Sequence, residues 1–223
     1  MKRITVLLAE DHMIVREGFR RLMEAETDIE VVGEAQTGRQ AVDMTKKLRP
    51  AVVVMDIAMP QLNGLEATRQ ILKAVPGTKV LILSAHSDDA YVEHATENGA
   101  VGFLLKQTSS HDLSRAIREV QKGNTFFSPS IDKRLHNQKL PLRGGALRKK
   151  VARLSSRELE VLQLIAEGKA NKQTAAELGI SIKTVEKHRQ NLMAKLNIHE
   201  ISGLTRYAIA AGIIESSVQL TIR

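Results

Sequence analysis

The feature that most constrains the fold of this chain is an alternation, within residues 1–125, of short apolar runs with segments of helical periodicity. The apolar runs are nearly continuous and rich in Val, Ile and Leu, which is typical of parallel strands buried on both faces. They span residues 4–9, 31–35, 51–55, 80–84 and 101–105. Between them, apolar residues recur every three or four positions, as on one face of a helix. The pattern predicts an α/β domain with a doubly wound, five-stranded parallel sheet, and a ligand site beyond the carboxyl ends of the strands.

A second domain of a different kind is expected after residue 153. Periodicity fails in residues 126–153, where eight basic residues accompany one acidic residue and prolines and glycines break longer elements, so this stretch predicts a basic linker. Residues 154–223 contain four short segments of helical periodicity, with serine caps and closing glycines. The middle two segments are joined by a tight turn at Gly179, which is typical of a helix-turn-helix. The expected organisation is an α/β domain at 1–125, a linker at 126–153 and a small all-α domain of four helices at 154–223.

The composition excludes several classes of protein. The chain has no cysteine, which excludes disulfides, thiolate metal sites and a cysteine nucleophile. No apolar run approaches the roughly 18 residues that span a bilayer, and the first residues do not resemble a signal peptide, so we expect a cytoplasmic protein without a membrane partner. The net charge of +8 is uneven, because residues 1–125 hold 16 basic and 17 acidic residues whereas residues 126–223 hold 17 and 8. This excess indicates that the C-terminal part meets a polyanion.

Five polar side chains follow the predicted strands, at the edge where a parallel sheet places its carboxyl ends. They are Glu10, Asp11, Asp56, Ser84 and Lys106. Three carboxylates at one edge repel one another unless a cation lies among them, and hard oxygen ligands favour Mg²⁺. Asp56 follows the central strand, so we expect its carboxylate to be the nucleophile that forms an acyl phosphate. Ser84 and Lys106 would then hold the phosphoryl oxygens.

Residues 3–122 resemble response-regulator receiver domains, which have a flavodoxin-like fold. The resemblance is carried by VLLAEDH at 6–12, VVMDIAMP at 53–60 with Asn63 and Gly64 after it, LSA at 83–85 and GAVGFLLK at 99–106. It implies that Asp56 accepts a phosphoryl group from a phosphohistidine of a sensor histidine kinase. The Mg²⁺ ligands that it implies are Glu10, Asp11, Asp56 and the backbone carbonyl of Ala58. It also implies that Ser84 and Phe103 form a switch pair, in which the hydroxyl moves toward the phosphoryl group and the ring turns inward.

The predicted helix that follows Ser181 has two distinct faces. A buried stripe is marked by Val185, Leu192 and Leu196. The opposite face carries Lys183, Lys187 and Gln190, with Glu186 and Asn191 beside them. In the major groove of DNA, Lys can reach guanine while Gln or Asn can pair with adenine, so this face predicts a helix that reads bases.

Residues 154–212 resemble the LuxR-type helix-turn-helix of response regulators of the NarL/FixJ class. The resemblance is carried by LSSRELEVL at 154–162, LGIS at 178–181, KTV at 183–185 and His188. It implies phosphate contacts from Asn171, Lys172, Thr184 and Lys195, and base contacts from Lys183, Lys187, Gln190 and Asn191. The last predicted helix presents Ile201, Leu204 and Ala208 as an apolar stripe. The corresponding helix forms the DNA-bound dimer in this family; the alternative is that part of the stripe packs onto its own domain.

Together these features predict a transcriptional regulator that is not an enzyme beyond its own phosphorylation and dephosphorylation. Phosphorylation of Asp56 by a histidine kinase, with Mg²⁺, is expected to shift the equilibrium toward a homodimer on double-stranded DNA. One alternative is a regulator that binds DNA independently of phosphorylation. Another is a haloacid-dehalogenase-like phosphatase, which needs a second aspartate two residues after the first, where this chain has Met13. A flavodoxin-like flavin binder is also disfavoured, because two carboxylates after the first strand repel phosphate.

Overall fold

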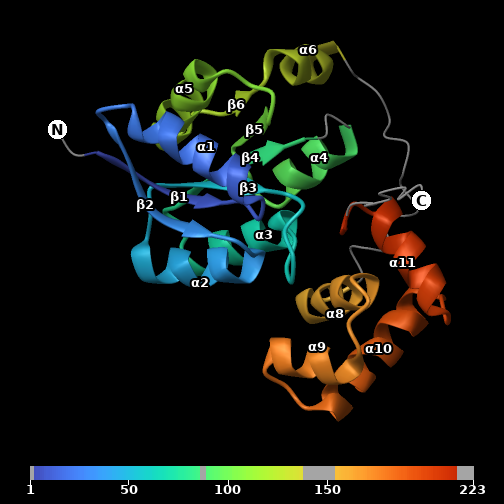
Figure 1. Ribbon diagram of the computed structural model, residues 1–223. Helices are drawn as coiled ribbons and strands as arrows, with labels where there is room; N and C mark the ends of the chain where they lie inside the picture. The colour runs from blue at the N-terminus through green and yellow to red at the C-terminus, as the bar shows by residue number, and fades with distance from the viewer. Residues whose placement is uncertain (1–2, 86–88, 138–153, 215–223) are drawn as a thin grey trace, which may run out of the picture. The chain divides into compact units, whose positions relative to one another are not determined.

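The chain forms two compact units, each with a hydrophobic core of its own. The structure, a computed structural model, describes residues 3–85, 89–137 and 154–214 (Figure 1). One unit comprises Met1–Leu140 and the other Pro141–Arg223. Among the described residues, no helix combines the length and the apolar character needed to cross a membrane.

The first unit is built on a parallel sheet with the strand order β2-β1-β3-β4-β5-β6. The strands are β1 (Ile4–Ala9), β2 (Ile29–Ala35), β3 (Val52–Asp56), β4 (Lys79–Ser84), β5 (Gly102–Leu105) and β6 (Phe126–Phe127). The first five confirm the expected doubly wound arrangement. The sixth differs from the expected five-stranded sheet, because two residues are too few to produce a period that the sequence could reveal.

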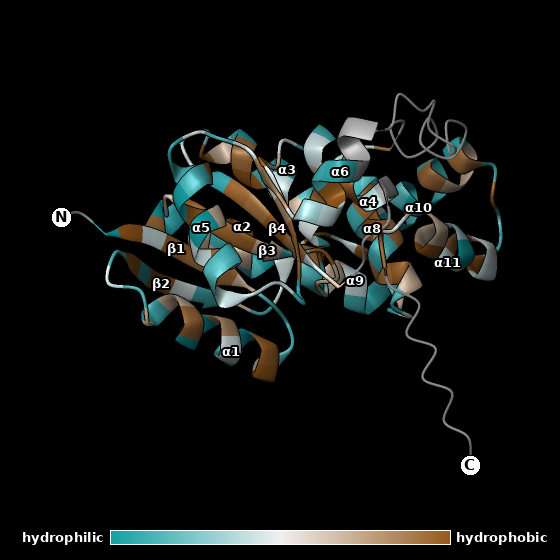
Figure 2. Cartoon of the chain, turned by 90° about the horizontal axis from the view of Figure 1, so that it is seen from above, coloured by the Kyte–Doolittle hydropathy of each residue, from teal (hydrophilic) through white to brown (hydrophobic). Residues whose placement is uncertain are grey.

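Five helices cover the two faces of this sheet. They are α1 (Met13–Glu24), α2 (Gly38–Leu48), α3 (Gly64–Ala74), α4 (Asp89–Glu97) and α5 (Ser110–Gln121). Successive side chains of a strand point to opposite faces, so Val53 and Met55 of β3 join the core under α2, α3 and α4, and Val54 joins the core under α1 and α5. Figure 2 shows the central strands as mainly hydrophobic, whereas the helices around them alternate in hydropathy. This pattern explains why nearly continuous apolar runs became strands.

The first unit continues beyond residue 125, where the linker was expected to begin. Phe127 of β6 pairs with Phe103 of β5, and α6 (Pro129–Asn137) buries Ile131 in the same core. Ser128 fastens this segment, because its backbone N–H donates to the Phe103 carbonyl (3.0 Å) and its hydroxyl accepts from the Leu105 N–H (3.1 Å). The expected linker therefore starts too early, and the rest of it, residues 138–153, lies outside the described residues.

The second unit has the four helices that the sequence predicts. They are α8 (Ser156–Ala166), α9 (Asn171–Leu178), α10 (Ile182–Leu196) and α11 (Ile201–Ala210). Ser155 caps α8 by accepting from the Glu158 N–H, and Ser181 caps α10 by accepting from the Thr184 N–H. Gly179 ends α9 with φ of 62°, a left-handed conformation that glycine adopts without strain. The short α9, this turn and α10 form the helix-turn-helix.

Candidate functional site

The carboxyl ends of four neighbouring strands bring charged and polar side chains together in the first unit. We call Glu10, Asp11, Asp56, Ser84 and Lys106 the strand-end cluster. Glu10, Asp56 and Ser84 are each at most 2% exposed. The Nζ atom of Lys106 lies 2.9 Å from Oε2 of Glu10 and 3.0 Å from Oδ2 of Asp56. The lysine therefore joins the end of β5 to the ends of β1 and β3.

Ser84 lies beside this ion pair at the end of β4. It pairs in register with Leu105, and its carbonyl accepts from the Lys106 N–H at 2.8 Å. The structure thus brings the expected hydroxyl and ammonium side chains to adjacent strand ends, next to the expected nucleophile.

The cluster raises the pKa of Asp56 to about 6. Burial is the main cause, and the negative charge of Glu10 adds to it, while Lys106 acts in the opposite direction. Burial alone would lower the pKa of Lys106, but the charges of Asp56 and Glu10 outweigh it and the pKa is raised. At neutral pH the cluster therefore holds an ionised Asp56 next to a protonated lysine.

The donor set of the cluster fits a hard divalent cation. Three buried carboxylate oxygens, Oε2 of Glu10, Oδ1 of Asp11 and Oδ2 of Asp56, have no hydrogen bond of good geometry, although each lies within 3.0 Å of a lysine or histidine nitrogen. Glu10 and Asp56 contact the one ammonium of the cluster, and Asp11 lies against Nδ1 of His12 at 2.8 Å. With three carboxylates and one ammonium, the cluster keeps an excess of negative charge. Oxygen ligands with excess negative charge suit Mg²⁺. Ala58, whose carbonyl is the fourth expected ligand, is half-buried in the loop after Asp56.

That loop is tightly packed against the end of β3. The Gly64 N–H donates to the Ile57 carbonyl at 2.8 Å, and the Asn63 side chain caps α3 by accepting from the Glu66 N–H at 2.9 Å. A Cβ atom on Gly64 would lie 1.9 Å from the carbonyl oxygen of Asp56. Only glycine therefore allows α3 to begin this close to the expected phosphoacceptor.

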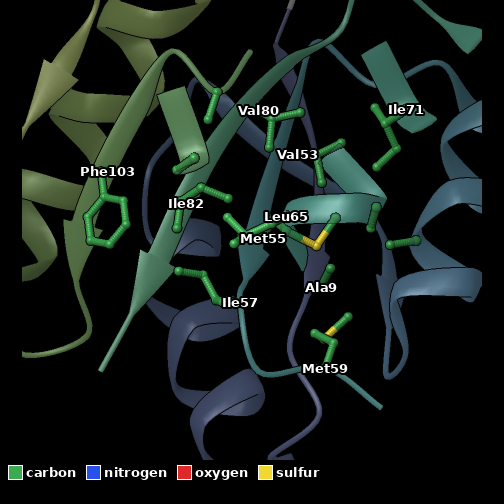
Figure 3. Packing of buried hydrophobic residues seen from close by; sticks show 14 of the residues in the cluster. Ala9, Val53, Met55, Ile57, Met59, Leu65, Ile71, Val80, Ile82 and Phe103 are labelled. Atoms are coloured by element: carbon green, nitrogen blue, oxygen red, sulfur yellow. The ribbon is translucent and has the colours of Figure 1, made fainter. Parts of the chain in front are cut away.

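Phe103 lies away from the cluster, in the core of the sheet. The ring is fully buried, and Phe103 pairs in register with Ile82 of β4 (Figure 3). Tyr91 packs against the same core. Its inward position is one of the two orientations that the resemblance assigns to this residue.

In the second unit, α10 has the two faces that the sequence predicts. Val185, Leu192 and Leu196 are fully buried. The exposed face carries the four residues expected to contact bases, namely Lys183, Lys187, Gln190 and Asn191. Ile182, at the start of α10, is also exposed (45%), and the sequence pattern did not mark it.

Of the four side chains expected to contact phosphate, three already have partners within the unit. Asn171 accepts from Nη1 of Arg189, and the Thr184 hydroxyl lies 2.8 Å from that of Ser181. Nζ of Lys195 donates to Oε2 of Glu158 at 2.7 Å. Burial alone would raise the pKa of Glu158, but Lys195 and Ser155 hold it below its usual value. The fourth, Lys172, is exposed on α9.

The structure corrects the stripe expected for dimerisation on α11. Leu204 and Ala208 are fully buried in the core of their own unit, whereas Ile201 is 55% exposed. Periodicity shows which residues share a helix face but not what covers that face. Of the three expected residues, Ile201 is the one available for contact with a second chain.

Two arginines that the sequence analysis did not single out contact residues of these sites. Arg16 is buried and hydrogen-bonds to the backbone of Glu10, and Arg189 holds Asn171. The burial of Arg16 could have been predicted from the sequence, because Arg16 is three residues before Phe19 and so lies on the apolar face of its helix. No comparable signal marks Arg189.

Comparison with known proteins supports this description of both units. Residues 6–118 match the response regulator receiver domain family, and residues 152–208 match the luxR family of bacterial regulatory proteins. The chain is 36% identical over 211 residues to the transcriptional regulatory protein DegU of Brevibacillus brevis, covering 89% of each chain. It is 36% identical over 214 residues to the oxygen regulatory protein NreC of Staphylococcus carnosus, covering 94% of this chain and 99% of that protein. The solved complex of the two-component response regulator RcsB with DNA has 29% identity and a TM-score of 0.57, over 92% of this chain and 98% of that one.

The fold and the two matched families define a two-component regulator. The chain belongs to the response regulators of the NarL/FixJ class, in which a receiver domain is followed by a LuxR-type helix-turn-helix. It is a transcription factor of that family, and its members are generally not enzymes. This membership gives no support to the phosphatase and flavin-binding alternatives.

Proposed function

We propose that this regulator is switched by phosphorylation of Asp56, and that the switch controls its binding to double-stranded DNA as a homodimer. The observation that carries the proposal is the buried contact of Lys106 with both Glu10 and Asp56 at the edge of the sheet. A cation and a carboxylate in contact at this edge support the acceptance of a phosphoryl group there. The phosphodonor is a phosphohistidine of a sensor histidine kinase.

In the transfer, a carboxylate oxygen of Asp56 attacks phosphorus. The O–P bond forms as the P–N bond to the histidine breaks, and the imidazole leaves with a proton from solvent. Lys106 and the Ser84 hydroxyl donate to oxygens of the transferred group. Mg²⁺, when bound, neutralises charge on that group; Glu10, Asp11, Asp56 and the carbonyl of Ala58 would hold it.

The phosphoacceptor assignment is tested by mass spectrometry. Incubation of the full chain with Mg²⁺ and acetyl phosphate is expected to add about 80 Da, the mass of one phosphoryl group. Asp56→Ala is expected to remove the adduct completely, because it removes the one carboxylate of the cluster that follows the central strand β3, where it contacts Lys106.

The matched control is Asp43→Ala, which removes an exposed carboxylate from α2 and is expected to leave the adduct unchanged. An adduct that persists in Asp56→Ala contradicts the assignment. A wild-type chain that forms no adduct, yet binds DNA, supports the phosphorylation-independent alternative.

DNA binding is proposed for the exposed face of α10. This face is basic, it follows a capped turn, and the related RcsB has been solved with DNA. Lys183, Lys187, Gln190 and Asn191 would contact bases, while Asn171, Lys172, Thr184 and Lys195 would contact phosphates. The partners of Asn171 and Lys195 within the unit would fix the direction in which these two side chains approach the backbone of DNA.

Two lysine variants separate reading of bases from binding of phosphates. Lys187→Ala is expected to relax sequence preference at one position, by about 1–3 kcal/mol of discrimination. Lys172→Ala is expected to weaken binding to all sequences alike. It should also reduce the slope of the logarithm of the binding constant against the logarithm of the salt concentration by about one. Selection from random DNA, followed by a salt titration on the selected site, measures both effects. An unchanged preference in Lys187→Ala would remove this residue from the reading face.

Phosphorylation acts in this proposal by a shift between populations. A change in the ratio of active to inactive conformations from 1:99 to 99:1 requires about 5.5 kcal/mol of differential stabilisation, and a partial switch requires less. The exposed Ile201 of α11 would contribute to the homodimer, in which two α10 helices contact adjacent half-sites.

A further inference from the structure

A buried arginine lies behind the acidic loop at the end of β1. Arg16, 8% exposed, donates from Nη1 to the carbonyl oxygen of Glu10 at 2.9 Å and toward that of Asp11 at 3.4 Å. Its Nε donates to Oε2 of Glu34 at 3.2 Å. One guanidinium therefore contacts two successive carbonyls of the loop that carries two of the expected Mg²⁺ ligands.

The charge of Arg16 is already balanced away from the strand-end cluster. Glu34, near the end of β2, accepts from Arg16 with one oxygen and from Nη1 of Arg20 with the other, at 2.8 Å. Arg16 lies on the face of α1 that also buries Phe19 and Met23, where an apolar side chain would otherwise pack. Its contribution to the cluster is therefore orientation of the backbone rather than net positive charge.

The loop needs such a restraint because its side chains repel one another. The Glu10 N–H makes the final ladder bond to the Ala35 carbonyl at 3.0 Å, and the pairing of β1 with β3 ends at Ala9. Beyond that point, the carboxylates of Glu10, Asp11 and Asp56 favour rotation of the backbone that separates them. Hydrogen bonds from a planar guanidinium to both carbonyls oppose this rotation.

We infer that Arg16 is a positioning residue for the divalent cation of the receiver, an inference that rests on the proposed phosphoacceptor function. It holds the peptide groups of Glu10 and Asp11 so that both carboxylates face the cation site before the metal arrives. Outer partners of metal ligands typically contribute tenfold to hundredfold in affinity.

The test is a calorimetric titration of the full chain with Mg²⁺, combined with thermal unfolding in metal-free buffer. Arg16→Met is expected to raise the Mg²⁺ dissociation constant about tenfold or more. Arg16→Lys keeps the charge but lacks the planar fork, so a weakening of several-fold is expected to remain. The control is Arg21→Met, which removes an exposed arginine of the same helix and should leave Mg²⁺ binding unchanged.

A merely structural role for Arg16 would lower the unfolding temperature without changing the Mg²⁺ dissociation constant, and that result overturns the inference. Full restoration of affinity by Arg16→Lys also overturns it, because charge alone would then suffice. If Arg16→Met fails to fold, Arg16→Lys decides the question. The two proposals fail separately: a wild-type chain that binds Mg²⁺ without forming an adduct contradicts the phosphoacceptor function, whereas the titration still judges Arg16.

Discussion

Gly64→Ala is expected to destabilise the first unit by about 3 kcal/mol or more. The added Cβ would lie 1.9 Å from the carbonyl oxygen of Asp56 and 3.0 Å from the Cα atom of Ile57. Both neighbours are backbone atoms at a buried strand end, so relief requires movement of β3 away from the start of α3. The same movement would displace the Asp56 carboxylate from Lys106.

The matched control is Gly18→Ala in the middle of α1. A Cβ there meets no atom within 4 Å, so the substitution is expected to stabilise the helix by about 0.5–1 kcal/mol. Urea unfolding followed by hydrogen exchange distinguishes the two units, since peptides from residues 3–137 report on the first. Equal protection of these peptides in Gly64→Ala and wild type would show that the loop between β3 and α3 accommodates the added Cβ atom at little cost in stability.

Asp56→Asn is expected to increase the stability of the metal-free first unit by about 3 kcal/mol at pH 7.5, given about 1.36 kcal/mol for each pKa unit. The pKa of Asp56 is raised from 3.8 to about 6 in the folded chain. The folded state thus binds the proton more tightly than the unfolded state, and wild type loses stability as the pH rises through about 6. The variant carries no such charge, so its advantage should disappear below about pH 4.

Urea titrations at several pH values, in the presence of a chelator, measure this difference. Asp43→Asn serves as the control, because that carboxylate is exposed and its replacement should have no such pH dependence. Mg²⁺ should reduce the difference in the free energy of unfolding between the variant and wild type, because it stabilises wild type more. A variant that is less stable than wild type at pH 7.5 would show that the contact with Lys106 outweighs burial and repulsion.

The strand-end cluster could be predicted from the sequence because parallel topology leaves little freedom. Once the apolar runs form parallel strands, the residues after Ala9, Met55 and Leu105 must lie at one edge of the sheet. The bond of Lys195 to Glu158 could not be predicted in this way, because it joins residues 37 positions apart in helices whose packing the periodicity does not specify. The dimer contact expected for Leu204 was wrong for a related reason, because an apolar helix face can pack against a second chain or against the core of its own unit.

The way the chain leaves the first unit has a mechanical consequence. Ser128 is bonded on both its backbone and its hydroxyl to β5, the strand that carries Phe103 and leads directly into Lys106. A displacement of that strand would therefore act directly on Ser128 and on the start of α6, through one backbone bond and one bond to the Ser128 hydroxyl. The strand that leads into Lys106 and the segment that begins α6 are therefore expected to move together.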